Sequence, residues 1–101
     1  MGVDAIGSSL SGVRSGFERR NASAHNVANL LTDDFRPLRA HQSEVEAGGS
    51  RVEIERASQP ETVDLAREFV DSSLASLQTK ASLRVLDTDL DLVGTLIDTL
   101  G

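Results

Sequence analysis

Residues 63–100, VDLAREFVDSSLASLQTKASLRVLDTDLDLVGTLIDTL, contain no proline and a single glycine, Gly94. Apolar side chains recur at steps of three and four residues, the spacing of one face of an α-helix. They form two runs with an offset, or stutter, between them: Val70, Leu74, Leu77 and Ala81, then Leu83, Leu86, Leu90, Val93, Ile97 and Leu100. At 1.5 Å per residue the predicted helix is about 55 Å long. That is too long for a compact globule of this size, so we expect it to lie against another helix of this chain or of a second subunit.

The start of this helix carries two candidate caps. Ser58-Gln59-Pro60-Glu61 has the form of a capping box with proline in the first turn, and Thr62 is a second candidate N-cap. We therefore expect the helical segment to begin within residues 58–63.

Helical spacing is absent from residues 33–57, where Asp33-Asp34 and Pro37 interrupt the pattern. Gly48-Gly49 separates two candidate strands, residues 41–45 and 51–54, and the second alternates apolar with charged side chains. A small hairpin that turns at the glycines fits this pattern. A solvated loop fits nearly as well, because two strands alone are marginally stable in water.

Residues 4–31 predict a second, weaker helix. Ile6, Leu10, Val13 and Phe17 recur at helical spacing, and Ala24, Val27 and Leu31 resume the pattern. Three internal glycines each cost about 1 kcal/mol relative to alanine, so the helix should need a partner. The spacing of Gly12 and Gly16 favours a close approach to another helix, since the neighbouring charges exclude a lipid-embedded segment.

The charge distribution argues against nucleic-acid binding. The net charge is −6, with +1 in residues 1–42, −3 in 43–62 and −4 in 63–101, and no basic face is clustered. There is no cysteine, which excludes disulfides and thiolate metal sites. No apolar run reaches the length of a transmembrane helix, and the first residues lack the pattern of a cleaved signal peptide.

No residue pattern indicates catalysis, a metal or a cofactor. Asp87, Asp89, Asp91 and Asp98 have part of the spacing of a calcium loop, but Leu92 occupies the position where such loops need glycine. The two histidines, His25 and His41, lack a second ligand at helical spacing. We expect a protein that is not an enzyme and binds no cofactor.

Two motifs resemble one known family. Residues 24–36, AHNVANLLTDDFR, resemble the N-terminal signature of bacterial flagellar rod and hook axial proteins, approximately A-N-N-I-A-N-x-x-T-P-G-[YF]-[KR]. Residues 63–70, VDLAREFV, are similar to the V-D-L-A-x-E-F-V/T that opens the family's C-terminal helix, and Thr95-Leu96-Ile97 is similar to its close. With their helical patterns the two motifs cover about two-thirds of the chain. The chain departs from the signature at His25 and at Asp33-Asp34, which stands in place of Pro-Gly.

The resemblance implies a mainly all-α fold, in which two long helices pack as an antiparallel coiled coil around a short central loop or β-hairpin. The segments would be 1–36 with the signature motif, 37–60 as linker or hairpin, and 61–101 as the C-terminal helix, together one domain. It also implies a structural subunit of the flagellar basal-body rod that forms oligomers with itself and other axial proteins. Such a subunit is exported by the flagellar type III apparatus without a cleaved signal peptide and resides in the periplasmic rod.

The assembly interface is expected on the two helices and their motifs. Asn26 and Asn29 are interpreted as register-fixing hydrogen-bonding residues between helices or subunits, with capping of the helix end as the alternative. The full set of predicted interface residues is Leu10, Val13, Phe17, Asn26, Val27, Asn29, Phe35, Leu65, Phe69, Leu77, Leu86, Val93 and Ile97. The alternative function from the same sequence is a cytoplasmic helical adaptor or secretion chaperone.

Overall fold

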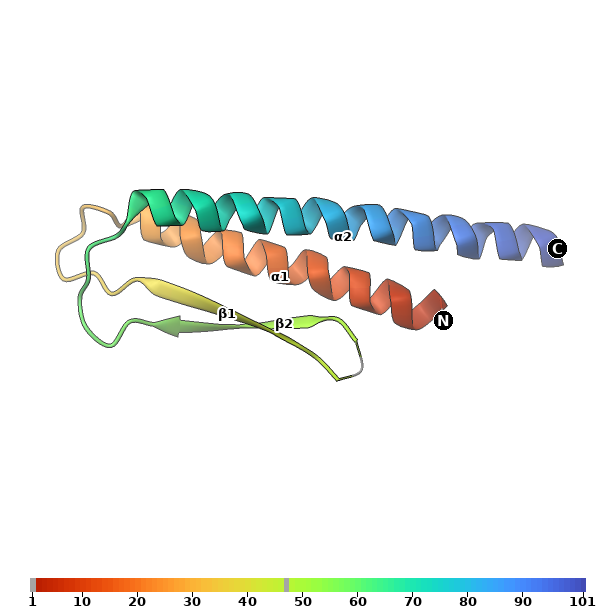
Figure 1. Cartoon of the computed structure of the whole chain (residues 1–101), viewed down its shortest axis with the longest axis horizontal. Helices are drawn as coiled ribbons and strands as arrows, with labels where there is room; N and C mark the ends of the chain where they lie inside the picture. Colours follow the sequence, from red (N-terminus) through yellow and green to blue (C-terminus); the bar gives the residue numbers. More distant parts are fainter. Residues whose placement is uncertain (1, 47) are drawn as a thin grey trace.

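The computed structural model describes residues 2–46 and 48–101 and is mostly helical. Helix α1 spans Gly2–Ala28 and helix α2 spans Leu65–Leu100, with strands β1, Leu38–Glu44, and β2, Ser50–Arg56, between them in the chain. The two helices lie side by side and run in opposite directions (Figure 1). The end of α2 extends beyond the start of α1, because α2 has 36 residues and α1 has 27.

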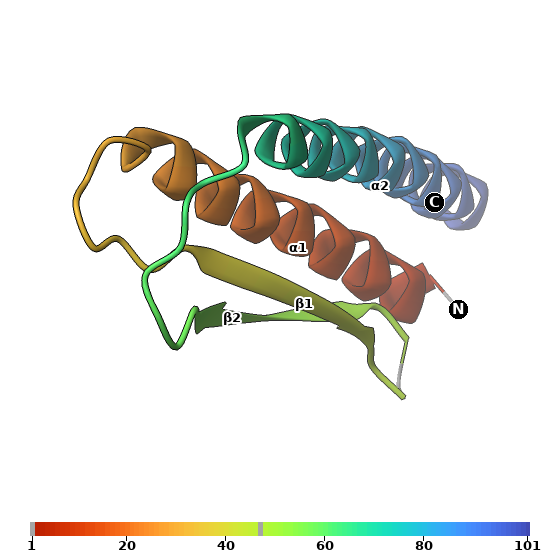
Figure 2. The same ribbon diagram turned by 60° about the vertical axis from the view of Figure 1, so that its left-hand side comes forward.

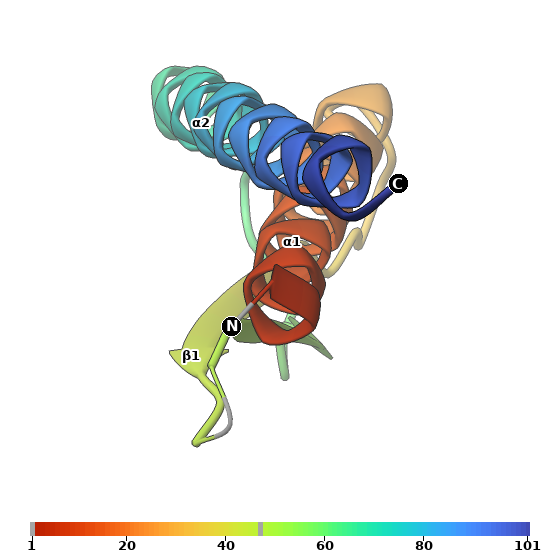
Figure 3. The ribbon, with the colours of Figure 1, turned by 90° about the vertical axis from the view of Figure 1, so that its right-hand side faces the viewer.

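The hairpin lies against α1 on the side away from α2 (Figures 2 and 3). Its two strands are antiparallel, with Leu38 opposite Arg56 and Glu44 opposite Ser50. Gly48 and Gly49 adopt φ values of 96° and 95°, which glycine reaches without strain. Of the two interpretations of residues 33–57, the hairpin is therefore the one observed, and both strands are longer than predicted.

Hydroxyl groups attach the hairpin to α1. The Ser50 backbone N–H donates to Ser11 Oγ at 3.0 Å, and the hydroxyls of Ser15 and Ser50 are 2.8 Å apart. Near the other end of the hairpin, Leu38 and Ile54 line one shallow pocket together with Ala22 of α1. The hairpin thus buries a small, mostly polar face of α1, and the layer order is α2, α1, hairpin.

The capping prediction for α2 is wrong at residue level. The N-cap is Asp64, whose Oδ1 accepts from the Arg67 backbone N–H at 3.1 Å, and residues 58–62 are not helical. The backbone there has other partners, since Ala57 N–H donates to the Pro37 carbonyl and Glu61 N–H to the Phe35 carbonyl. These contacts hold the chain extended until Val63 is buried.

The end of α1 also differs from the prediction, since the helix stops at Ala28 instead of Leu31. The chain then turns, and Asp34 adopts a φ of 54°. Asp34 occupies the position of the glycine in the family signature, and aspartate is among the few side chains that tolerate this left-handed conformation. The chain therefore adopts a left-handed conformation at this turn with aspartate instead of glycine.

The molecule is elongated, with dimensions of 62 × 23 × 15 Å and a radius of gyration of 17.3 Å. A compact chain of this length has a radius of gyration of about 13 Å. Among the residues whose burial is described, the buried apolar side chains are Ala22, Pro37, Val63 and Ala75, all small or of moderate size. Few large side chains are therefore covered within a single copy.

Candidate functional site: an interhelical polar cluster and exposed apolar faces

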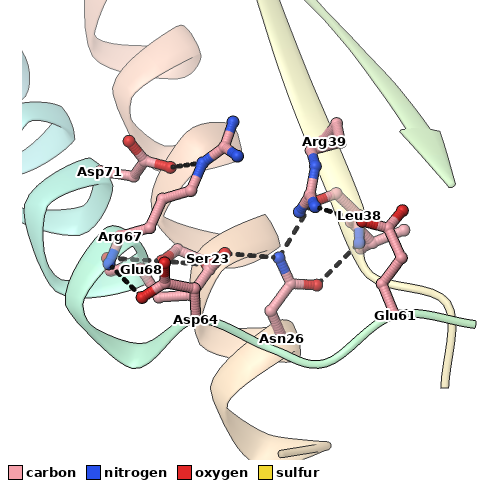
Figure 4. Close-up of polar contacts among 9 residues, drawn as sticks. All are labelled: Ser23, Asn26, Leu38, Arg39, Glu61, Asp64, Arg67, Glu68 and Asp71. Carbon is pink, nitrogen blue, oxygen red and sulfur yellow. Dashed lines mark hydrogen bonds and ion pairs between the residues drawn. The ribbon is translucent and has the colours of Figure 1, made fainter. Parts of the chain in front are cut away.

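Asn26 is the centre of a buried polar cluster that joins three elements (Figure 4). Its side chain is 1% exposed. Asn26 Nδ2 donates to the Leu38 carbonyl at 2.9 Å and to Glu68 Oε1 at 3.0 Å, while Asn26 Oδ1 accepts from the Leu38 N–H at 2.7 Å. One amide group of α1 therefore fixes both the start of β1 and the first turns of α2.

Glu68 of α2 completes the cluster and is 5% exposed. Ser23 Oγ lies 2.8 Å from Glu68 Oε2 and 2.9 Å from the Glu68 carbonyl oxygen, and its single hydrogen is shared between these two acceptors. Burying a carboxylate is costly unless its oxygens accept hydrogen bonds, and here both do. Among the described residues, no buried side-chain nitrogen or oxygen lacks a partner.

The cluster joins the two sequence motifs through Asn26 and Glu68, which are 42 residues apart in the chain. Asn26 belongs to the motif at 24–36, and Glu68 belongs to the motif at 63–70. Sequence reasoning gave Glu68 no role of its own. One sequence feature could have indicated its role. Glu68 lies seven positions before Ala75 and eleven before Thr79, so all three share one face of the helix, on which the other side chains are small.

The contact between the helices beyond this cluster is made by small residues. A Cβ atom added at Gly16 would overlap Thr79 Oγ1 and lie 3.1 Å from the Ala75 carbonyl oxygen, and one added at Gly12 would overlap the Ser82 hydroxyl. The predicted close approach at the two glycines is thus confirmed. We call the contact between Ser9, Gly12, Gly16 and Ser23 of α1 and Glu68, Ala75, Thr79, Ser82 and Asp89 of α2 the interhelical seam.

The predicted apolar stripe of α1 does not enter this seam. Leu10, Phe17 and Val27 are 48%, 50% and 44% exposed, and Val13 is half-buried. Since successive helix residues are about 100° apart, these side chains lie on one flank of the seam, and the hairpin contacts at Ser15 and Ala22 lie on its other flank. Coiled-coil pairing of the two helices within one chain through this stripe is therefore not confirmed.

The apolar residues of α2 lie on two different faces. Leu83, Leu86, Leu90, Val93 and Ile97 lie along the edge of the seam, where Leu86 and Val93 are half-buried and Leu83, Leu90 and Ile97 are exposed. The earlier run, which includes Val70, Leu74 and Leu77, points away from α1 and is exposed throughout. The apparent stutter in the sequence is the change from one face to the other.

A shallow apolar groove lies where the two helices meet near the polar cluster. It is lined by Ala24, Val27 and Ala28 of α1 and by Leu65 and Phe69 of α2. Phe69 is 74% exposed although it is one of only three aromatic residues in the chain. We call this groove, with the exposed Leu10 and Phe17 of the same side of α1, the apolar face.

The structure distinguishes Asn29 and Phe35 from Asn26. Asn29 Nδ2 donates to the His25 carbonyl at 2.9 Å, and its Oδ1 accepts from the Thr32 hydroxyl at 3.0 Å. Asn29 therefore satisfies the helix end, which was the alternative interpretation. Phe35 is half-buried and its ring packs 5.6 Å from that of His25. Of all predicted interface residues, Asn26 alone is buried within the described part of the chain.

No cluster of three or more His, Cys, Asp or Glu side chains within residues 2–46 and 48–101 has the geometry to hold a metal ion. Asp89 accepts a hydrogen bond from Ser9 at 3.3 Å across the seam, and His41 lies 3.3 Å from Glu55 on the hairpin. Neither helix contains an apolar segment long enough to span a bilayer in the described residues. Comparisons with protein-family models and with curated proteins found no match.

Proposed function

We propose that this chain is a structural subunit of the bacterial flagellar basal-body rod, which assembles with copies of itself and with other axial proteins through its two terminal helices. The two motifs that resemble rod proteins support the proposal from the sequence. In this role the chain is exported through the flagellar type III apparatus without cleavage, and it performs no catalysis.

The exposure of the large apolar side chains is the observation that carries the assembly role. The solvent-accessible surface of the chain is 7219 Å². A compact monomer of 10.8 kDa exposes about 5,500 Å². Side chains such as Phe69, Leu77 and Ile97 are more than 60% exposed, which exceeds what scattered surface residues explain. A subunit that is buried on several sides by neighbours accounts for this surface.

We also propose that the antiparallel coiled coil is completed between subunits. Within one chain the helices meet through glycine, serine and alanine, so their large apolar residues are free to act as knobs for helices of neighbouring subunits. The buried Asn26–Glu68 hydrogen bond supports this arrangement, because it holds the two helices at one relative position. Subunits would then present their apolar faces in a constant geometry.

The test uses Phe69→Asp in a bacterium whose own copy of this gene is deleted. Phe69 is largely exposed, so the variant chain should fold, and a carboxylate in the apolar groove should prevent a neighbouring helix from docking. We expect the wild-type protein in purified basal bodies and the variant absent from them, with loss of motility.

The matched control is Val45→Asp, which replaces an exposed apolar residue at the turn of the hairpin, away from the apolar face. This variant should be incorporated normally. If wild-type protein stays in the cytosol and never co-purifies with basal bodies, the rod assignment is wrong, and the adaptor or chaperone alternative gains support.

A further inference from the structure

The exposed face of α2 has a repeat that differs from that of a coiled-coil heptad. Nine positions along one side of the helix are spaced four, three and four residues apart, so the pattern recurs every eleven residues. The three related sets are Val70, Ala81 and Leu92; Leu74, Val85 and Leu96; and Leu77, Thr88 and Thr99. All nine side chains are exposed and point away from α1, and we call them the outer stripe.

An eleven-residue repeat has about 3.67 residues per turn, close to the 3.6 of an undistorted helix. The outer stripe therefore drifts around α2 by only about 20° per eleven residues, in the sense that gives a right-handed supercoil. An apolar stripe of about 44 Å with this slow drift suits a second helix laid alongside it. The stripe covers about four-fifths of α2, whose 36 residues span about 54 Å.

The charges beside the outer stripe are segregated along α2. On one flank, Lys80 and Arg84 are followed by Asp87 and Asp91, all exposed. Lys80 and Arg84 are four residues apart, as are Asp87 and Asp91, and like charges at this spacing destabilise an isolated helix. In the described residues none of these four side chains makes an ion pair with another part of the chain.

We infer that the outer stripe is a self-complementary interface, which pairs antiparallel and two-fold with the outer stripe of a second copy of this chain. The midpoint of the stripe falls between Arg84 and Val85. A two-fold axis within one residue of this point places Lys80 beside the partner copy's Asp91 position and Arg84 beside its Asp87 position. In an antiparallel helix pair, the flank of one helix faces the corresponding flank of its partner. Each of the four charged side chains therefore lies beside an opposite charge of the second copy. In a parallel pair the two unlike flanks would face one another, so none of these four charges would meet another of the set.

The surface area agrees with this second contact. The chain exposes roughly 1,700 Å² more than a compact monomer of its mass, and a standard interface buries about 800 Å² per partner. The excess is sufficient for one interface at the apolar face and another at the outer stripe. The pairing does not depend on the rod assignment, because it is argued from α2 alone.

Cysteine cross-linking of the full chain tests the orientation, since the protein contains no native cysteine. Val85→Cys lies beside the proposed axis and should cross-link to itself with a short bis-maleimide. Val70→Cys, at one end of the stripe, should not cross-link to itself, but should do so to Thr99→Cys when the two variants are mixed. Self-cross-linking of Val70→Cys as fast as that of Val85→Cys would overturn the antiparallel arrangement.

Charge reversal tests the pairing itself by sedimentation equilibrium. The double variant Lys80→Glu/Arg84→Glu should raise the dimer dissociation constant by roughly tenfold or more, because it replaces attraction by repulsion at symmetric sites. Adding Asp87→Lys and Asp91→Lys to this double variant should restore the dimer dissociation constant to near the wild-type value. Far-UV circular dichroism checks that each variant is folded, as expected for exposed positions.

The proposal fails if the wild-type chain is monomeric at about 200 micromolar, a concentration at which a weak dimer should still form. It also fails if the quadruple variant dimerises no better than the double variant. Either result would leave the basal-body experiment unaffected. A protein that dimerises through α2 but is absent from basal bodies would refute the rod assignment alone.

Discussion

Gly16→Ala gives the most direct test of the interhelical seam. Alanine stabilises the interior of a helix by about 1 kcal/mol relative to glycine, so the substitution is favourable for α1 considered alone. In the folded chain the added methyl group would overlap Thr79 Oγ1 and press on the Ala75 carbonyl oxygen at 3.1 Å. The threonine hydroxyl already donates to that carbonyl at 3.0 Å, so it has little freedom to move aside.

The matched control is Gly7→Ala in the same helix. No atom lies within 4 Å of a Cβ atom built at Gly7, so only the gain in helix propensity operates there. Because both variants have this gain, the difference between them isolates the packing cost, which for an overfilled contact is about 1–3 kcal/mol. We expect Gly7→Ala to be more stable than wild type by about 1 kcal/mol, and Gly16→Ala to be no more stable or less stable.

Urea unfolding followed by far-UV circular dichroism measures both variants at one protein concentration, so that any self-association contributes equally. For a domain of this size, 1 kcal/mol corresponds to about 4–8 °C in Tm, which gives an independent thermal measurement. Equal stabilisation by the two alanines would refute the close approach at Gly16. Destabilisation by both would show instead that α1 is not helical near Gly7.

Four other substitutions, in two matched pairs, test the remaining contacts by the same measurement. Asn26→Ala should destabilise the fold by about 2–4 kcal/mol, because it leaves Glu68 and the Leu38 backbone short of partners, whereas Asn29→Ala should cost less than about 1 kcal/mol. Asp64→Ala should cost about 0.5–2 kcal/mol as loss of the α2 N-cap, and Ser58→Ala should have no measurable effect. Equal effects of the two asparagine variants, or a larger effect at residue 58 than at residue 64, would contradict the structure.

The regular elements could be predicted because their signals are local. The absence of proline from residues 63–100 and the steps of three and four residues require a long helix, and two adjacent glycines favour a turn between the strands. The start of α2 could not be predicted, because residues 57–61 use their backbone groups to pair with residues 35–37. The residue at which α2 begins therefore depends on a contact between distant parts of the chain, which a local cap motif does not indicate.

The faces of the helices could be predicted only in part. Periodicity of large apolar residues shows that a face of α1 or α2 is suited to contact another helix, but it does not say whose helix. Here the partner within the chain is selected by small residues such as Gly16 and Ala75, which contribute little to a hydrophobic pattern. The large residues Phe17 and Leu77 consequently remain exposed, and their assignment to an assembly interface stays a prediction.

The buried Glu68 has a physical role because small residues pair the two helices while the large apolar residues remain exposed. Gly12 and Gly16 of the seam make room for Ser82 and Thr79, so these close contacts already favour one position of the helices along each other. Shifting one helix by a turn would also remove Asn26 and Ser23 from the carboxylate of Glu68, and leaving a buried charge without partners costs about 3–5 kcal/mol. The polar cluster therefore strengthens the register that the small residues of the seam favour. Fixing that register also fixes the position of the apolar face relative to the outer stripe, which a subunit needs if neighbours are to contact both at once.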